Sequence, residues 1–463
     1  CVRRSEQFRI ERRSRGEIPG SARFRMQQNG HRPCSRSTNT GRCLAAHEQS
    51  WREAALRPSD RTIRSLQVVV QKGITTVNDN SSYHAATPDI NRARSSTTCY
   101  CWLMTEATAD LAELEPDELK TQLSALGAEP FHARQLYRWI HNRGLERVEG
   151  MTDLSRPLRE QLRQTFTFST PQIAAREVST DGTEKFLFTL TDGMTIESVF
   201  IPDTPSMTFC ISTQAGCAMR CGFCLTGRMG LVRHLTAGEI AGQVRVLARE
   251  LHLQNHRFNL VFMGMGEPLH NYDATMKALR MLSAEDGLAV TPKRVTLSTI
   301  GIMPAFKRLA SERWLPNLAV SLHATTDEIR HALIPTSRNQ RLTDLIDVCR
   351  RFPIKHRDRI TFEYVLLKDV NDTTADATRL AELLQGLRAK VNLIPLNEAR
   401  GIPFSRPSDQ QVNHFARTVA SNGLVVSVRK SRGRDIRAAC GQLIIEGVSH
   451  RSNAQSSADE GNE

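Results

Sequence analysis

Short apolar runs alternate with longer amphipathic stretches over the second half of the chain. The apolar runs lie at 207–213, 258–264, 294–299, 317–322, 360–367, 391–395 and 424–429. Helical spacing is found between them, at 236–251, 272–283, 303–311, 341–352, 373–387 and 408–421. This alternation is typical of parallel strands with crossover helices. Because six units are too few for a closed eight-stranded barrel, it predicts an α/β fold with a partial (β/α)6 barrel over 206–446. A doubly wound sheet is the alternative.

Two smaller elements precede this region. In 115–144 the apolar residues follow helical spacing, with Gly127 and Gly144 as stop signals, which predicts a small helical domain over 104–165. Residues 185–190 and 195–201 flank Asp192-Gly193, which predicts a β-hairpin in a linker over 166–205.

The first 103 residues have a different character. They are rich in Arg, Ser, Thr and Asn, and they begin with Cys rather than Met. Such a stretch buries too little apolar surface to offset its ordering entropy, so we expect it and the tail 447–463 to be disordered. Met104 is then a candidate natural start. A transit peptide is the alternative, because residues 1–47 hold eleven Arg against three acidic residues.

The positive charge is concentrated in the same segment. The chain has 62 Lys and Arg against 49 Asp and Glu, a formal charge of +13, but residues 1–103 alone hold 18 against 8. A polyanionic partner must therefore be recognised by a local patch in the rest of the chain. No apolar run approaches the roughly 20 residues that span a bilayer, and we expect a cytoplasmic protein with no membrane partner.

Three cysteines follow the first barrel strand in a C-x3-C-x2-C spacing: Cys217, Cys221 and Cys224. In a reducing compartment such spacing indicates metal binding or catalysis rather than disulfides. Three thiolates on one loop can hold three irons of a [4Fe–4S] cube and leave the fourth open. A structural zinc site, the alternative, needs four ligands, and neither a second C-x2-C nor an H-x3-H lies nearby.

Polar residues follow the other strands. Gly266 and Glu267 lie after the second strand, Ser298 ends the third, Ser321-Leu322-His323 ends the fourth, and Asn397 follows the sixth. Taken singly, each is an ordinary residue at a strand end, and His323 alone is more often a satisfied core histidine. Because the chemistry of parallel barrels lies at the carboxyl ends of the strands, we expect them to line one mouth around the cysteine loop.

Two further cysteines can face the same mouth. Cys210 lies on the first strand and Cys440 lies just beyond the last, which favours a catalytic thiol pair. Cys349, on a predicted helix, is interpreted as a small buried hydrophobic residue.

With these positions the sequence resembles the RlmN/Cfr family of radical SAM (S-adenosylmethionine) RNA methyltransferases. The matching segments are 209–217, the cysteine loop, 264–268, 321–323, 392–397 and 435–443, and the resemblance covers about 104–446. It implies a radical-SAM barrel with a helical accessory RNA-binding domain, one [4Fe–4S] cluster per chain on the three loop cysteines, and two SAM per turnover. The implied SAM contacts are Gly266, Glu267, Ser298, Ser321, Leu322, His323 and Asn397.

The resemblance also implies a reaction that avoids direct attack by the non-nucleophilic carbon 2 of adenine. One SAM methylates Cys440, and a second yields a deoxyadenosyl radical that removes a hydrogen from the S-methyl group. The methylene radical adds to the adenine, and the adduct loses a proton to Glu197. Cys210 then attacks the Cys440 sulfur, leaving a transient disulfide that must be reduced. The alternative for Glu197 is a solvated strand carboxylate.

The implied substrates are adenosine 2503 of 23S rRNA and adenosine 37 of certain tRNAs, with a reducing electron donor such as flavodoxin and a monomeric enzyme. Five basic residues between 429 and 437 are candidate phosphate contacts. The Cfr branch, which methylates carbon 8 of the same rRNA adenosine, shares every motif quoted and is the first alternative. A non-catalytic, zinc-dependent RNA-binding module is the second.

Overall fold

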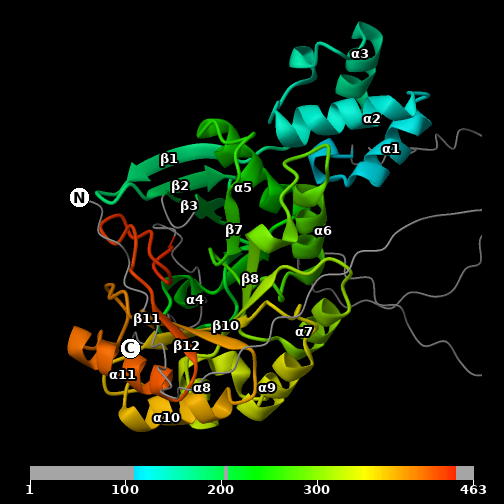
Figure 1. The fold of residues 1–463 in the computed structure, drawn as a ribbon. Helices are drawn as coiled ribbons and strands as arrows, with labels where there is room; N and C mark the ends of the chain where they lie inside the picture. The colour runs from blue at the N-terminus through cyan, green and yellow to red at the C-terminus, as the bar shows by residue number, and fades with distance from the viewer. Residues whose placement is uncertain (1–108, 203–206, 445–463) are drawn as a thin grey trace, which may run out of the picture. The chain divides into compact units, whose positions relative to one another are not determined.

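The computed structural model describes residues 109–202 and 207–444, which belong to one compact unit (Figure 1). Its centre is a ten-stranded sheet in the order β1-β2-β3-β4-β7-β8-β9-β10-β11-β12. The predictions made for 1–103 and 447–463 concern residues outside the described ranges.

Seven neighbouring strands of this sheet run parallel, and each predicted apolar run overlaps one of them, although β11 begins two residues before its run. They are β4 (Thr208–Cys210), β7 (Asn259–Phe262), β8 (Val295–Thr299), β9 (Asn317–Ser321), β10 (Ile360–Leu366), β11 (Ala389–Pro395) and β12 (Val425–Val428). Their spatial order follows the chain without reversal, which excludes the doubly wound alternative. β12 does not pair with β4, so the predicted partial barrel is confirmed.

Helices cover the outer face of the parallel strands (Figure 1). The six predicted crossover helices are α5 (Ala237–Glu250), α6 (Tyr272–Ser283), α7 (Met303–Ala310), α9 (Leu342–Arg351), α10 (Thr374–Leu383) and α11 (Asp409–Ser421). The sequence did not predict the short helices α4 (Leu225–Met229) and α8 (Asp327–Leu333), nor the 3-10 turns η4 (Pro292–Arg294) and η5 (Pro335–Ser337). Cys349 lies on the buried side of α9 and is 2% exposed, which confirms its interpretation as a buried hydrophobic residue.

The predicted hairpin is present as β2 (Glu184–Thr189) and β3 (Thr195–Ile201). A third strand, β1 (Gln172–Val178), pairs with β2, and β3 pairs antiparallel with β4. The hairpin therefore extends the barrel sheet itself. β1 escaped prediction because six of its seven residues are exposed, so no apolar alternation marks it.

A separate two-stranded sheet frames the cysteine loop: β5 (Gln214–Gly216) and β6 (Leu231–His234). Gly216 adopts a φ of 77°, and a Cβ there would lie 2.0 Å from the Gly230 carbonyl oxygen. Only glycine allows this close approach. The cysteine loop begins at the next residue, Cys217.

The N-terminal helical region has its own apolar core, built around Leu119, Leu136 and Leu162. Its elements are η1 (Leu111–Glu113), α1 (Pro116–Ala125), α2 (Pro130–Tyr137), η2 (Arg138–Asn142), η3 (Val148–Gly150) and α3 (Arg156–Thr165). The Tyr137 hydroxyl donates to the Met281 carbonyl oxygen at 2.9 Å, and other polar contacts join α1 to α6. These contacts place the region beside α5 and α6.

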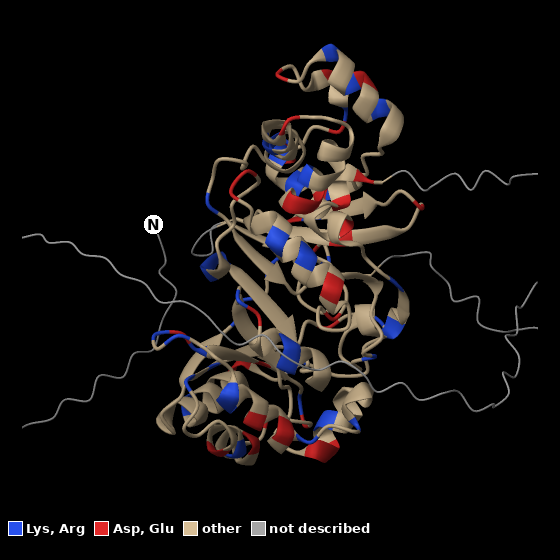
Figure 2. Ribbon diagram, turned by 90° about the vertical axis from the view of Figure 1, so that its right-hand side faces the viewer, with Lys and Arg blue, Asp and Glu red and all other residues tan. Residues whose placement is uncertain are grey.

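Lys and Arg are interspersed with Asp and Glu along the surface helices (Figure 2). This mixture agrees with the near balance of charge in the sequence after residue 103. Among the residues described, no helix is long and apolar enough to cross a membrane.

Asn371 joins the ends of two strands and provides a test of the fold. Its Nδ2 donates to the His323 and Val365 carbonyl oxygens and its Oδ1 accepts from Leu367 N, all at 2.8 Å, and the side chain is fully buried. Asn371→Ala leaves these backbone groups unpaired, so we expect the free energy of unfolding in urea to fall by about 3–5 kcal/mol.

The matched control is Asn422→Ala, because Asn422 is exposed and donates only to the Thr418 carbonyl oxygen. We expect a change within about 0.5 kcal/mol there. Equal losses in the two variants would contradict the role given to Asn371.

Candidate active site

The cysteine loop runs from the end of β5 to the start of α4 and is held by backbone hydrogen bonds. Cys217 N donates to Gly230 O at 2.8 Å, Gly222 N donates to Leu333 O at 2.9 Å, and Leu225 N donates to Gly441 O at 2.8 Å. Cys217 and Cys221 are 8% and 9% exposed, within an apolar cluster that includes Leu333. The loop is therefore fixed from β6, from the end of α8 and from the C-terminal segment.

Burial raises the pKa of the Cys217 thiol to about 12, and that of Cys221 well above its usual value. The pKa of Cys224 is also raised by burial, and the three sulfurs influence one another electrostatically. Without a metal these thiols stay protonated, so binding one must release their protons. No group of three or more His, Cys, Asp or Glu within 109–202 and 207–444 is arranged to hold a metal ion. The interpretation as a cluster site rests on the loop itself, which offers three soft ligands at one buried position.

Glu267 lies beside this loop, at 4% exposure. Its carboxylate accepts from Leu269 N and from Ile300 N, both at 3.0 Å, so it joins the ends of β7 and β8. Gly266, with φ 103°, packs so closely on Gln214 that a Cβ would lie 2.7 Å from that side chain. Burial raises the pKa of Glu267 to about 7.

The third and fourth strands bring their predicted residues together. The hydroxyl oxygens of Ser298 and Ser321 lie 3.4 Å apart on neighbouring strands. His323 adopts a φ of 59°, and its Nδ1 accepts from Val365 N at 3.1 Å. That bond assigns the ring proton to Nε2 in the neutral form, and burial lowers the pKa of His323 to about 3. Its ring contacts Phe223 of the cysteine loop edge-on, with centroids 4.8 Å apart.

The side chain of Leu322 is fully buried in the core, so its backbone is the part that can take part in the site. Its carbonyl oxygen and that of Ser321 both accept from Nη1 of Arg330 on α8, and Nη2 donates to Ile300 O at 2.7 Å. Arg330 was not predicted as part of the site. It joins the ends of β8 and β9 behind the cysteine loop.

Cys210 and Cys440 line one pocket, together with Asn397, Arg429 and Met263. Asn397 Nδ2 donates to the Cys440 carbonyl oxygen at 3.1 Å, while its buried Oδ1 has no partner. Burial raises the pKa of Cys210 to about 12. The structure thus brings the two predicted thiols to one pocket, and the unpaired amide oxygen suits a ligand with a donor group.

The basic segment 429–437 divides into inward and outward parts. Arg429 lines the pocket, and its pKa is raised by Cys440 first and by Glu363 and Cys210 after it. Arg432 lies 4.0 Å from the Asp181 carboxylate at the β1–β2 turn. Lys430 also lines the pocket but is exposed, as are Arg434 and Arg437, so these three are better placed than Arg429 to meet phosphates.

Glu197, on β3, is 4% exposed, which excludes the interpretation as a solvated strand carboxylate. Its Oε1 lies 3.2 Å from Lys185 Nζ, and its Oε2 accepts from Ile444 N at 2.8 Å. Burial raises the pKa of Glu197, although Lys185 opposes the shift. The carboxylate is not part of the lining of the Cys210–Cys440 pocket, but its bond to Ile444 connects it to the segment that carries Cys440.

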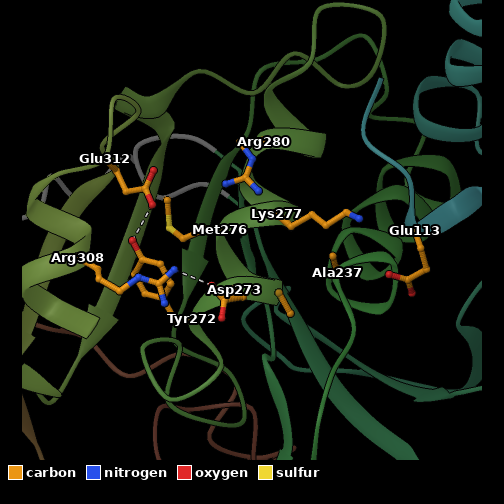
Figure 3. A pocket seen from close by; sticks show the side chains of 10 residues that line it. Glu113, Ala237, Tyr272, Asp273, Met276, Lys277, Arg280, Arg308 and Glu312 are labelled. Carbon is orange, nitrogen blue, oxygen red and sulfur yellow. Dashed lines mark hydrogen bonds and ion pairs between the residues drawn. The ribbon is translucent and has the colours of Figure 1, made fainter. Parts of the chain in front are cut away.

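A larger hollow of about 420 Å³ lies away from these residues, between η1, α5, α6 and α7 (Figure 3). Its polar side chains already have partners: Tyr272 donates to Glu312, and Arg308 pairs with Asp273, each at 2.7 Å. Lys277 and Arg280 pair with α1 and its N-cap. None of the predicted site residues lines this hollow, so we do not assign the chemistry to it.

Comparison with known proteins agrees with this geometry. The model of the radical SAM superfamily matches residues 211–381, and that of the ribosomal RNA large subunit methyltransferase N-terminal domain matches 109–168. A dual-specificity RNA methyltransferase RlmN from Anaeromyxobacter dehalogenans (strain 2CP-C) is 47% identical over 346 residues, 73% of this chain and 93% of that protein. The chain belongs to the RlmN family of radical SAM methyltransferases.

Further RlmN relatives have the same extent. RlmN of Geobacter sulfurreducens (strain ATCC 51573 / DSM 12127 / PCA) is 47% identical over 334 residues, 72% of this chain and 91% of that protein. The crystal structure of a radical SAM methyltransferase from Sphaerobacter thermophilus superposes with a TM-score of 0.69 at 42% identity, and covers 72% of this chain and 99% of that one. A radical SAM domain implies a [4Fe–4S] cluster and SAM, which the three loop thiols and the unpaired Asn397 oxygen fit.

The sequence analysis did not predict two buried charged residues near the site, Glu363 and Arg330, and only Glu363 had a signal that could have revealed it. Glu363 interrupts the apolar run of β10 and is 5% exposed, accepting from Asn392 Nδ2 at 2.7 Å. A charge inside such a run is a usable signal. Arg330 lies in a helix of seven residues, too short for its periodicity to separate a buried arginine from an exposed one.

The raised pKa of Glu267 predicts a pH dependence of stability. Below pH 4.5 the carboxyl is protonated in both the folded and the unfolded chain, so its full contribution is present. As the pH rises towards 7 the unfolded chain releases the proton first, and we expect about 3 kcal/mol of stability to be lost. Glu267→Gln removes this titration.

The measurement is urea unfolding of the cluster-free chain, wild type and Glu267→Gln, at intervals from pH 4.5 to 8. The difference between the two free energies of unfolding should change with pH over this range. Parallel curves would show that the Glu267 carboxyl keeps its ordinary pKa in the fold.

Proposed function

We propose that this chain methylates carbon 2 of adenosine 2503 in 23S rRNA and of adenosine 37 in tRNAs, through an S-methylcysteine and a covalent RNA–protein intermediate. The curated relatives are named dual-specificity RNA methyltransferases, which supports an RNA substrate. The observation that carries the mechanism is the shared pocket of Cys210 and Cys440 beside the cysteine loop. Two thiols outside a cluster site are needed only if one carries a group and the other releases it.

In this proposal Cys217, Cys221 and Cys224 hold a [4Fe–4S] cluster. The cluster and SAM together supply the 5′-deoxyadenosyl radical. Gly266, Glu267, Ser298, Ser321, Leu322, His323 and Asn397 form the SAM site. His323, neutral throughout the physiological range because of its lowered pKa, offers an Nε2–H donor. Glu267, which follows β7 at the same edge of the sheet, offers backbone and carboxylate oxygens.

Cys440 accepts the methyl group by displacement at the SAM methyl carbon, and a later hydrogen abstraction leaves a methylene radical that bonds to the adenine. Arg429 lines the same pocket and places a positive charge beside both thiols. Once the adduct has given up its unpaired electron to the oxidised cluster and a proton to the base, Cys210 attacks the Cys440 sulfur. An S–S bond forms as the bond from sulfur to the RNA-bound carbon breaks, and that carbon keeps the electron pair and takes up a proton to become the methyl group. An external reductant then restores both thiols.

Glu197 is the proposed proton acceptor for the adduct. Its raised pKa and its bond to Ile444 N support a group that can take up a proton close to the Cys440 segment. Lys430, Arg434 and Arg437 are the proposed phosphate contacts, and the helical region 109–168 is the accessory RNA-binding domain. A reductant such as flavodoxin, a monomeric state and a cytoplasmic location complete the proposal.

The first test is peptide mass spectrometry of the purified chain after incubation with SAM and reduced cluster. We expect a +14 Da methyl on Cys440, absent in Cys440→Ala, together with complete loss of RNA methylation. Cys349→Ala is the control, because Cys349 is also a free cysteine but lies buried on α9. An unmodified Cys440 in active wild-type protein would contradict the mechanism.

Mapping the methyl group on the modified RNA separates the two branches of the family. Isotope-labelled methyl on carbon 2 of the adenine supports the proposal, and label on carbon 8 assigns the chain to the Cfr-type reaction. Labelling of rRNA and tRNA in separate reactions decides whether both are substrates.

Cys210→Ala tests the release step. Without the attacking thiol the bond between the Cys440 methylene and the adenine persists, so we expect a covalent RNA–protein species on denaturing gels, sensitive to ribonuclease. Product release should fall at least 100-fold while Cys440 is still methylated. Normal turnover by Cys210→Ala would assign release to another group.

A further inference from the structure

Arg330 is a fully buried charge without a carboxylate partner. Its side chain has 0% exposure and is the largest of the fully buried side chains. In the part of the chain that the structure describes, it takes part in no ion pair. Asp327, one turn earlier on α8, accepts from Leu342 N at 2.7 Å and acts on Arg330 as a nearby negative charge, without forming an ion pair with it. Burying a charge is costly unless an opposite charge compensates it.

The groups that Arg330 does contact are neutral. Nη1 donates to the Ser321 and Leu322 carbonyl oxygens, Nη2 donates to Ile300 O, and Nε has no partner. Burial lowers the pKa of Arg330 to about 10, so the group is still charged near neutral pH. Carbonyl dipoles solvate the cation in part, but they do not neutralise it.

The cysteine loop lies against the same helix. Gly222 N donates to Leu333 O at the end of α8, and Thr336 Oγ1 donates to Met219 O at 3.3 Å. Leu333 and Ile334 pack in one apolar cluster with Cys217 and Cys221. Arg330 is also close enough to Cys221 for each to influence the charge of the other.

We propose that Arg330 is the buried counter-charge of the thiolate-bound cluster and holds its reduction potential up. The inference rests on the cluster assigned under the proposed function. A cluster with three thiolate ligands carries net negative charge, and reduction adds one more. A fixed cation in a medium of low dielectric stabilises the more negative state more strongly. Arg330 therefore acts on the cluster through its charge, without touching the reacting atoms.

A purely structural role is the competing explanation, since Arg330 also joins the ends of β8 and β9. Arg245 on α5 supplies a matched control. It is 3% exposed, donates to Ser169 O and Thr170 Oγ1 at 3.0 Å, leaves Nη1 without a partner, and has a pKa lowered to about 10 by burial. It packs towards the helical region 109–168, where its charged neighbours are Asp110, Glu113, Glu146 and Arg249.

The experiment uses the full chain reconstituted with iron and sulfide under anaerobic conditions. Arg330→Met, Arg330→Lys and Arg245→Met are compared with wild type. The readouts are iron and sulfide per chain, the cluster midpoint potential from spectroelectrochemical titration, and thermal unfolding with and without the cluster. None of these depends on methyl transfer.

For Arg330→Met we expect the ratio of reduced to oxidised cluster at a fixed applied potential to fall about tenfold, equivalent to about 59 mV for a one-electron couple. Arg330→Lys keeps the charge and should keep the potential within about twofold of wild type by the same ratio. Arg245→Met should leave the potential unchanged, although it also removes a buried cation.

An unchanged potential in Arg330→Met overturns the inference. If Arg330→Met retains no cluster, thermal unfolding of the cluster-free chain distinguishes the two explanations. Unfolding at the wild-type temperature supports the counter-charge role. Failure to fold shows that Arg330 is needed for the structure and overturns the inference. A wild-type chain that binds no iron–sulfur cluster refutes the proposed function as well. A wild-type chain with a normal cluster but no effect of Arg330→Met refutes only the counter-charge.

Discussion

Parallel pairing of seven consecutive strands is the constraint on which the rest of the molecule depends. Since β4 and β7 to β12 all run the same way, their carboxyl ends meet at one edge. Residues separated by more than 200 positions, such as Cys210 and Cys440, thereby reach one pocket. An interrupted or reversed order would send half of these side chains to the opposite edge.

The edge created in this way is rich in buried polar groups, and several of them form hydrogen bonds with a neighbouring strand end. Glu267 accepts from Ile300 N, Arg330 donates to Ile300 O, and Asn371 holds the carbonyl of His323. Breaking a hydrogen bond in such a buried network costs free energy, so movements of the strand ends are opposed and the mouth is rigid. Rigidity suits chemistry in which a reactive carbon must meet one partner and no other.

The sequence was sufficient to predict the barrel, because long periodic segments with clear apolar runs leave few alternatives. It also predicted a loop of three closely spaced cysteines and a second pair of thiols, which the structure places before α4 and in one pocket. β1 could not be predicted, because its residues are mostly exposed and its pairing is set by β2. The role of Arg330 could not be predicted either, since burial of a charge depends on segments brought together only by folding.

The link between the β1–β2 turn and the Cys440 segment has a consequence for biosynthesis. Ser179 Oγ donates to Asp435 Oδ1 at 2.6 Å, across a separation of 256 residues. At about 5–20 residues per second, a ribosome needs roughly 10–50 s to make the chain between them. During that interval the sheet edge and the cluster loop exist without the segment that carries Cys440. The two pocket thiols are therefore kept apart until translation is almost finished, whereas the three loop cysteines are all present long before Cys440 is made.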